Sequence, residues 1–282
     1  MRGASRSWAV VHDFIQPVAE VNVSHFAMPV SLYMNAPVIS VSEGAKVTEV
    51  HRILSERHIS CVPIVDDGGA AVGVLSRTDL LRVGRLETKT HGRGLLLSLP
   101  DQTAREVMRA GVFMVAPGTQ VGQAANVMIK RRIHRVFVGN EGRLEGVFST
   151  KDLLLAIQDK RVSMPIREVM ASPAFTIPSS APLSLATDRL AKAHVSGLVV
   201  IDEEEWPVGT FTQTEAMLAR DVHTDTAVEE VMSHAMLCMD VRTPLHRAAA
   251  QAHATRARRV LAVEDRQVQG VLTGLDFARA AS

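Results

Sequence analysis

The stretch Gly73-Val-Leu-Ser-Arg-Thr-Asp79 occurs four times in this chain of 282 residues. The other copies are Gly146-Val-Phe-Ser-Thr-Lys-Asp152, Gly209-Thr-Phe-Thr-Gln-Thr-Glu215 and Gly270-Val-Leu-Thr-Gly-Leu-Asp276. Each copy has a glycine, two mostly apolar residues, a hydroxyl, two variable positions and a carboxylate. A fixed pattern that recurs in this way predicts duplicated structural units.

The residues around the first copy predict a β-α-β-β-α unit. Val47, Val50 and Leu54 recur at helical spacing, and two short apolar runs flank the turn residues 66–69. The expected elements are a strand over 38–41, a helix from 47 to about 58, strands over 61–65 and 71–75, and a short helix over 78–82.

One spacing rule fits all four copies. The first strands are expected to end at Val41, Val115, Ile177 and Met239, which lie 74, 62 and 62 residues apart. Seven residues before these ends every copy has a methionine, namely Met34, Met108, Met170 and Met232. The longer first spacing leaves room for a surface loop over 87–94 between the first two copies.

The chain is expected to have an α+β fold of four tandem units, paired into two modules. A unit of about 60 residues buries little surface alone, so units should pack in pairs. The first module then covers 28–161, with repeats 28–86 and 103–161. The second covers 162–282, with repeats 162–221 and 226–282. Residues 1–27 form an N-terminal extension of unassigned role, and the four units could close into a disc.

Composition and charge exclude several classes of protein. Apolar residues make up 46% and charged residues 22% of the chain, as in ordinary globular proteins. The net charge of +1 gives no electrostatic case for nucleic acid or membrane partners. The two cysteines, Cys61 and Cys238, make neither a disulfide framework nor a metal cluster. With no signal peptide or membrane span in the pattern, we expect a soluble, cytoplasmic protein.

Four β-α-β-β-α units that each end in Gly-φ-x-[Ser/Thr]-x-x-Asp resemble CBS (cystathionine-β-synthase) domains, and consecutive pairs are similar to Bateman modules. The resemblance covers about residues 28–282. The four-repeat layout is also similar to the gamma subunit of AMP-activated kinase. In that family the nucleotide lies between two paired repeats, so the resemblance implies a regulatory, energy-sensing protein.

The resemblance also implies roles for individual residues. The carboxylates would hold ribose hydroxyls, with Asp152 and Asp276 ranked first, Asp79 next and Glu215 last. The residues that would help hold the nucleotide beside them are Ser76, Thr78, Ser149, Lys151, Thr212 and Thr273. The residues that would face the base are Ile39 and Ile59 in the Asp152 cleft, and Phe175 and Val195 in the Asp276 cleft. Ordinary core packing remains an alternative for these four.

An alternation precedes the second strand of each unit. Units two and four have the dibasic pairs His134-Arg135 and Arg258-Arg259, whereas units one and three have Ser60-Cys61 and Ser196-Gly197. Facing units would then give each cleft a basic lip for phosphate and a small lip with room for a planar base. The basic pairs could instead stabilise a helix C-terminus through its dipole.

The motif itself has a ligand-free explanation. A hydroxyl at a helix N-cap with a carboxylate three residues later forms a capping box, and such a cap contributes about 1 kcal/mol. A carboxylate can also accept hydrogen bonds from two vicinal hydroxyls at once. The residues leave both explanations open, and the resemblance favours ribose binding.

No nucleophile elbow, P-loop or metal motif is present, and the repeats occupy nearly the whole chain, so we expect no enzymatic activity. The expected function is a regulatory protein that binds AMP, ADP or ATP, the last with Mg²⁺ if needed, and changes its shape or its affinity for a protein target. S-adenosylmethionine or a cyclic dinucleotide is an alternative ligand. A ligand-free interaction scaffold is an alternative function, and a homodimer is compatible with either.

Overall fold

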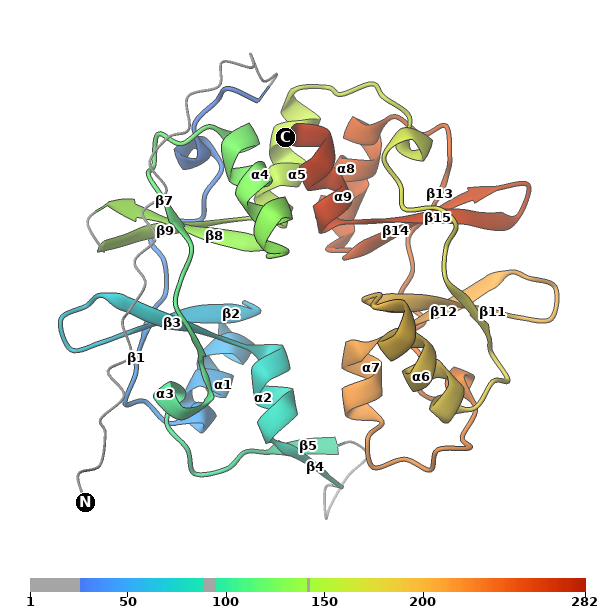
Figure 1. The fold of residues 1–282 in the computed structure, drawn as a ribbon, viewed down its shortest axis with the longest axis horizontal. Coiled ribbons are helices and arrows are strands. Elements are labelled where there is room, and N and C mark those ends of the chain that lie inside the picture. Colours follow the sequence, from blue (N-terminus) through green and yellow to red (C-terminus); the bar gives the residue numbers. More distant parts are fainter. Residues whose placement is uncertain (1–25, 89–94, 141–142) are drawn as a thin grey trace, which may run out of the picture.

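The computed structural model describes residues 26–88, 95–140 and 143–282, and it contains four copies of the β-α-β-β-α unit (Figure 1). The predicted fold class is therefore confirmed. The strand expected over 38–41 is shorter and lies at Val41–Ser42, and the expected helix from 47 ends at Glu56. Strand β4 (Arg85–Thr88) takes in residues 87–88 of the surface loop expected over 87–94, and the rest of that loop, 89–94, lies outside the described residues.

Each unit opens with a short helical turn or a four-residue helix. Unit one contains η1 (Val30–Leu32), β1 (Val41–Ser42), α1 (Val47–Glu56), β2 (Cys61–Val65), β3 (Ala71–Ser76) and α2 (Arg77–Val83). Unit two contains α3 (Ala104–Val107), β6 (Arg109–Ala110), β7 (Met114–Val115), α4 (Val121–Arg131), β8 (Arg135–Asn140), β9 (Arg143–Ser149) and α5 (Thr150–Asp159). Between these units lie β4 (Arg85–Thr88) and β5 (Leu95–Ser98), which pair antiparallel.

The second half of the chain repeats this order. Unit three contains η2 (Ile166–Glu168), β10 (Thr176–Pro178), α6 (Leu183–Ala193), β11 (Gly197–Ile201), β12 (Pro207–Thr212) and α7 (Gln213–Leu218). Unit four contains η3 (Val228–Glu230), β13 (Cys238–Asp240), α8 (Leu245–Thr255), β14 (Arg259–Glu264), β15 (Gln267–Thr273) and α9 (Gly274–Ala281). In every unit the strand before the long helix pairs parallel with the first strand after it, and that strand pairs antiparallel with the next one.

The opening segment of each unit packs on the other unit of its pair. Asn35 bridges to Val147 at the edge of unit two, and β6 of unit two adds to the edge of β3 in unit one. The second half repeats this exchange, because Ala171 bridges to Val271 and Ser233 bridges to Thr210. The exchange ties unit one to unit two and unit three to unit four, and in the first pair it brings a residue of the partner unit to Asp79 and to Asp152.

The exchange explains why the motif begins with glycine and why a methionine occupies a fixed slot. A Cβ atom on Gly270 would lie 2.7 Å from the Sδ atom of Met170 and 2.7 Å from the carbonyl oxygen of Ala171. The other three motif glycines meet the methionine of the partner unit in the same way: Gly73 meets Met108, Gly146 meets Met34 and Gly209 meets Met232. The backbones approach so closely there that only glycine fits.

Substituting alanine for Gly73 should therefore weaken the pairing of units one and two. The added Cβ would lie 2.7 Å from the carbonyl oxygen of Arg109, and backbone cannot move aside as a side chain can. We expect the free energy of unfolding to fall by about 1–3 kcal/mol, measured by urea denaturation. Gly118→Ala is the matched control, because a Cβ on Gly118 meets nothing within 4 Å. Equal stability of the two variants would contradict the close approach.

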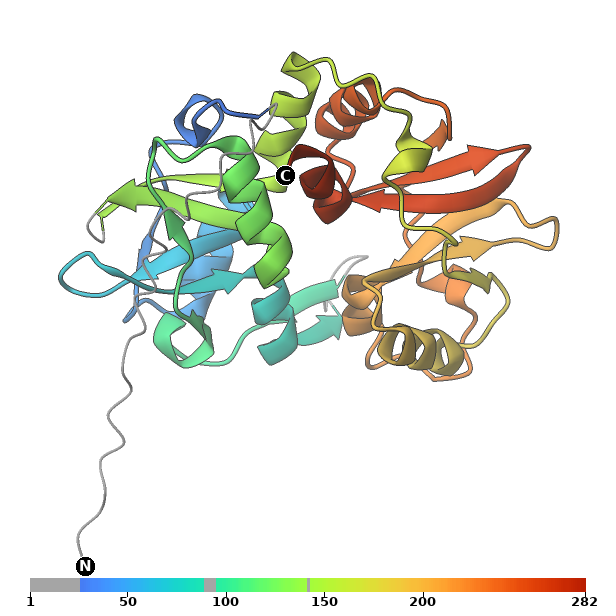
Figure 2. The same ribbon diagram turned by 45° about the horizontal axis from the view of Figure 1, so that its top comes forward.

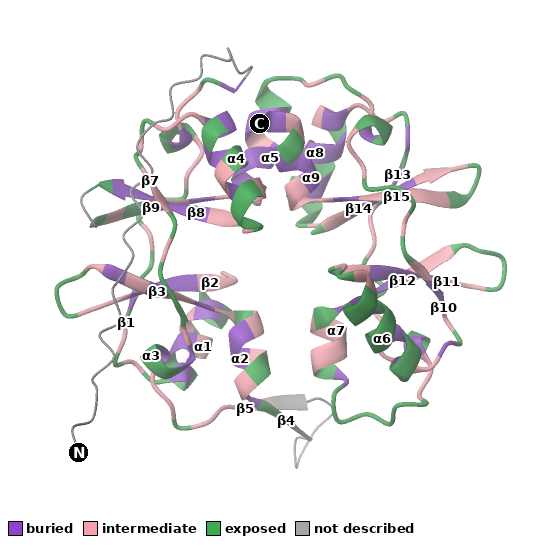
Figure 3. Ribbon diagram, viewed as in Figure 1, coloured by how far each residue is buried: buried purple, intermediate pink, exposed green. Residues whose placement is uncertain are grey.

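Two interfaces of different character join the two pairs. Helices α4 and α5 of unit two pack on α8 and α9 of unit four, and their apolar residues form one shared core (Figure 3). Units one and three each have a core of their own. Between them α2 packs on α7, and Arg220 donates to the carbonyl oxygens of Leu81, at 2.9 Å, and Gly84.

The four units stand at the corners of a ring. Figure 1 shows α4, α5, α8 and α9 together at one side and α2 with α7 at the opposite side, and the turned view of Figure 2 keeps this arrangement. At the shared core the N-termini of α5 and α9 touch, since a Cβ on Gly274 would lie 2.5 Å from Oγ1 of Thr150. Motif residues from the two pairs are therefore neighbours across the ring.

Candidate functional site

All four motif carboxylates take part in a capping box in the first turn of their own helix. Ser149 donates to Oδ2 of Asp152 from its backbone N–H and from its hydroxyl, both at 2.7 Å. The same pair of hydrogen bonds joins Ser76 to Asp79, Thr212 to Glu215 and Thr273 to Asp276. The capping explanation for the motif spacing thus holds in the structure. It uses one oxygen of each carboxylate.

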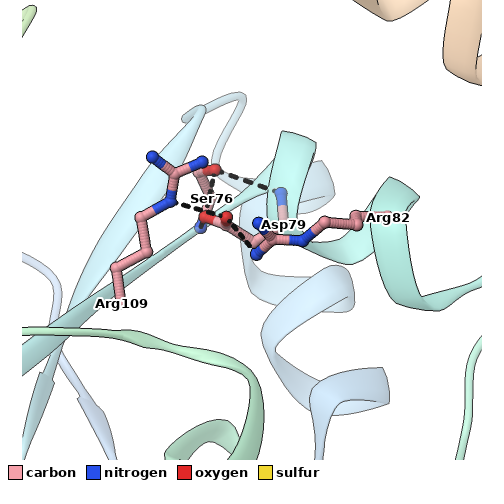
Figure 4. A network of polar contacts seen from close by, with 4 residues as sticks. All are labelled: Ser76, Asp79, Arg82 and Arg109. Atoms are coloured by element: carbon pink, nitrogen blue, oxygen red, sulfur yellow. Dashed lines mark hydrogen bonds and ion pairs between the residues drawn. The ribbon is translucent and has the colours of Figure 1, made fainter.

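The second oxygen of the three aspartates has different partners. Oδ1 of Asp79 accepts from Arg82 at 2.8 Å and from Arg109 at 2.9 Å (Figure 4), and Oδ1 of Asp276 accepts from Arg279 at 2.5 Å. Oδ1 of Asp152 accepts at 2.6 Å from the side-chain amide of Asn35, which is neutral. All three carboxylates are buried, so these partners decide how each charge is balanced.

The pKa of Asp152 is displaced upward. Burial is the main cause, and the hydrogen bonds from Ser149 and Asn35 act in the opposite direction. Burial without a cation disfavours the ionised form. A ligand that donates further hydrogen bonds to this carboxylate would favour ionisation and lower the pKa again.

A group of cations lies where units two and four meet. We define the cation group as Arg135, Lys151, Arg256, Arg258 and Arg259, and His134 lies within reach of their charges. Burial lowers the pKa of Lys151 most, followed by the positive charges of Arg258, Arg256 and Arg135, while Asp152 opposes the shift. Burial also lowers the pKa of His134, and Arg135, Arg259 and Arg258 lower it further. Cations of both pairs therefore act on one another, an arrangement that an anionic ligand would relieve.

Two members of the cation group reach the small residues expected to face them. Arg259 donates to the carbonyl oxygen of Ser196 at 2.7 Å and to its hydroxyl at 3.1 Å. Arg135 contacts the Ser60 hydroxyl at 3.4 Å and the Cys61 thiol. The basic residues of units two and four thus contact the small residues of units one and three, and their role in holding a phosphate and a base stays a prediction.

The residues expected to face a base lie on the exchanged segments and beside the second strands. Ile39 follows Asn35 by four residues, and 37% of its surface is exposed; Phe175 follows Ala171 by four residues, and 51% of its surface is exposed. Ile59 and Val195 are half-buried and pack against the cores of units one and three. The two exposed side chains are available to a ligand, whereas Ile59 and Val195 also serve the core.

Most of the remaining predicted residues belong to the capped helix N-termini. Ser76, Ser149, Thr212 and Thr273 are N-caps, and Thr78 is half-buried in the first turn of α2. Unit four lacks a hydroxyl at the position of Thr150, because Gly274 there lies against Thr150 itself. Glu215 accepts from Thr212, and its negative charge acts on the nearby Arg259.

The residues that contact the Oδ1 atoms of the three aspartates are not predicted by the sequence analysis. These are Asn35, Arg82, Arg109 and Arg279; Arg256 of the cation group is not predicted either. Asn35 and Arg109 directly follow the slot methionines, and Arg82 and Arg279 stand three residues after Asp79 and Asp276. The repeat spacing identifies these positions as equivalent between units. It does not indicate that the residue after the methionine of one unit contacts the motif acid of the paired unit.

Other features of the described residues lie apart from this site. A cavity of ≈ 580 Å³ opens between the end of α5 and the start of α8, and it is lined by Gln158, Asp159, Arg161, His246, Arg247 and Ala250. Within the described ranges no cluster of three or more His, Cys, Asp and Glu side chains could hold a metal ion. No helix among them is long and apolar enough to cross a membrane.

Residues 30–85, 104–159 and 166–221 each match the model of the CBS domain. The chain belongs to the CBS domain family. The three matches fall on units one to three, and unit four repeats the same order of elements as a CBS domain. The resemblance inferred from the four motifs is confirmed.

Related proteins include kinase gamma subunits. The 5'-AMP-activated protein kinase subunit gamma-3 of Bos taurus is 28% identical over 119 residues, which span 42% of this chain and 23% of that subunit. An uncharacterized protein of Methanocaldococcus jannaschii is 26% identical over 166 residues, 49% of this chain and 96% of its own length.

The structural likeness extends over all four CBS repeats. A protein from Methanocaldococcus jannaschii that has been proposed as an archaeal homologue of the kinase gamma subunit superposes with a TM-score of 0.70 at 14% identity. A conserved protein from Pyrococcus horikoshii superposes with a TM-score of 0.66 at 16% identity. Each covers 90% of this chain and 100% of the other. At these identities the likeness shows the fold alone.

Proposed function

We propose that this CBS-domain protein is a regulatory protein that binds a phosphorylated adenosine, of the AMP, ADP or ATP class, at Asp152. The ribose hydroxyls donate to the Asp152 carboxylate, and the phosphate lies against Lys151 and Arg258. Binding draws units two and four together through the ligand charge, and the resulting change of shape alters affinity for a protein target. The relation to a subunit of an AMP-activated kinase supports a regulatory role without catalysis.

The observation that carries the proposal is the neighbourhood of Asp152 and Lys151. The carboxylate has a neutral partner in Asn35, and the adjacent residue Lys151 lies among cations from the other pair. Ribose hydroxyls are donors that suit a carboxylate, and a phosphate is an acceptor that suits clustered Lys and Arg. One nucleotide supplies both groups at neighbouring points.

The same chemistry ranks the alternative ligands. S-adenosylmethionine has a positively charged sulfonium and no phosphate, so the cation group would repel it. A cyclic dinucleotide has phosphate but uses its ribose 3'-oxygens in the ring, so it lacks the vicinal hydroxyl pair that a carboxylate can hold. A mononucleotide with free 2'- and 3'-hydroxyls fits both parts of the site.

Thermal unfolding and calorimetric titration with AMP, ADP and ATP test the proposal. A ligand at a hundred times its dissociation constant should stabilise the folded chain by about 2.7 kcal/mol. Asp152→Asn should weaken binding by roughly 10- to 100-fold, because hydrogen bonds to a charged group contribute about 1.5–3 kcal/mol. Asp67→Asn, in the exposed turn after β2, is the matched control and should leave binding unchanged.

A ligand-free scaffold is the second candidate, and the four capping boxes favour it. They account for the motif without any ligand. Unchanged unfolding with all three nucleotides, together with a stable protein partner on affinity purification, would favour the scaffold and contradict nucleotide binding. Greater stabilisation by S-adenosylmethionine or a cyclic dinucleotide than by any mononucleotide would contradict the proposed ligand class.

A further inference from the structure

The four acids share one capping geometry, but two sequence positions decide what each outer oxygen faces. The first is the residue three after the acid: Arg82, Leu155, Leu218 and Arg279 in units one to four. The second is the residue after the slot methionine of the partner unit: Arg109 faces Asp79, Asn35 faces Asp152, and Ala171 and Ser233 occupy the slots opposite units four and three. The residues at these two positions therefore decide whether a motif acid has an arginine counter-ion.

At Asp79 both positions carry arginine. The carboxylate is 2% exposed, and its Oδ1 atom joins two guanidinium groups whose side chains are 56% and 66% exposed (Figure 4). At Asp276 only the first position does, and Arg279 alone makes the ion pair. At Asp152 neither does: Leu155 stands at the first position and Asn35 at the second.

The donors on the outer carboxylate oxygen determine how much free energy is lost when ribose hydroxyls replace them. A hydrogen bond between two ionised groups is roughly twice as strong as one between neutral groups, and guanidinium is a rigid, permanently charged donor. A ribose hydroxyl that displaced Arg82 or Arg109 would replace a charged donor by a neutral one at a buried carboxylate. At Asp152 a hydroxyl replaces or joins an amide, which is also neutral, so the exchange costs little.

We propose that Asp152 is the ribose-binding member of the three buried aspartates, and that Arg82 with Arg109, and Arg279, are built-in counter-ions that close Asp79 and Asp276 to ligands. This assignment rests on the proposed function and narrows it to one of the three buried aspartates. Asn35, which lies in the opening segment of unit one, would then be a specificity-determining residue for that site.

The assignment is tested by calorimetric titration with AMP, which reports affinity and the number of sites. Asp79→Asn and Asp276→Asn should each leave the AMP affinity within about twofold of the unsubstituted chain, whereas Asp152→Asn weakens it by roughly 10- to 100-fold. Asn35→Arg with Leu155→Arg installs the counter-ions of Asp79 at Asp152 and should also abolish AMP binding. The reverse exchange, Arg82→Leu with Arg109→Asn, should add a further AMP site.

The outcomes separate the two proposals. No AMP binding by the unsubstituted chain would overturn the proposed function and this assignment with it. AMP binding that Asp79→Asn or Asp276→Asn removes or clearly weakens would overturn the assignment while the proposed function stands. Should the double substitutions fail to fold, shown by loss of the circular dichroism of the parent chain, the three single Asp→Asn titrations decide the matter, since each replaces a carboxylate by a neutral amide of nearly the same shape.

Discussion

Replacing Phe277 by alanine is expected to lower the free energy of unfolding by about 3–5 kcal/mol. Phe277 lies on α9, is 3% exposed and belongs to the core that units two and four share. Helix α9 packs on both α4 and α5 of the other pair. The cavity left by the lost ring would therefore weaken the fold of unit four and its hold on unit two together.

Guanidinium denaturation followed by circular dichroism measures this effect. Phe175→Ala is the matched control, because Phe175 is half exposed and should cost only about 0.5 kcal/mol. A loss below about 1 kcal/mol for Phe277→Ala, or equal losses for both variants, would be inconsistent with a core common to the two pairs.

Lys151→Glu is expected to weaken AMP binding by roughly 100-fold, since it removes a charged hydrogen bond to phosphate and adds repulsion. Lys151 lies next to Asp152 and within electrostatic range of Arg256 and Arg258. The same change relieves repulsion among these cations, so the melting temperature of the nucleotide-free chain should not fall. The AMP affinity then falls while the stability does not, which a merely structural lysine would not produce.

Lys160→Glu is the control, because it makes the same charge change at the other end of α5. Lys160 is the exposed C-cap of that helix, and AMP affinity should be retained within about twofold after its substitution. Parallel titrations of the two variants at one salt concentration decide the point. Equal affinity of the Lys151 and Lys160 variants would remove the cation group from the site.

Much of the fold could be predicted from the sequence, because the same weak pattern of apolar spacing occurs in four copies. Apolar spacing such as Val47, Val50 and Leu54 defines a helix only loosely, but the same spacing in four copies defines a unit. The fixed methionine and the motif glycine were also visible. Their contact across the pair was not, because chain spacing cannot say that Met34 packs on Gly146 of the other unit rather than on Gly73 of its own.

The sequence predicts the capping geometry of the motif acids, but it does not predict how the four acids differ in their other partners. The capping geometry followed from the three-residue spacing of Ser149 and Asp152. The contrast between Arg109 and Asn35 at equivalent positions carries meaning only once each is seen to face the partner's acid. The surface loop expected over 87–94 is wrong at residues 87–88, because these residues pair with β5 through backbone hydrogen bonds that their own side chains do not indicate.

A crystal structure of the chain grown with AMP tests the central claim most directly. The account predicts AMP with its ribose hydroxyls on the Asp152 carboxylate, beside Asn35, and its phosphate at Lys151 and Arg258, while Asp79 keeps its ion pairs with Arg82 and Arg109. AMP bound at Asp79 with those arginines displaced, or Asp152 still paired with Asn35 alone at saturating AMP, would contradict it.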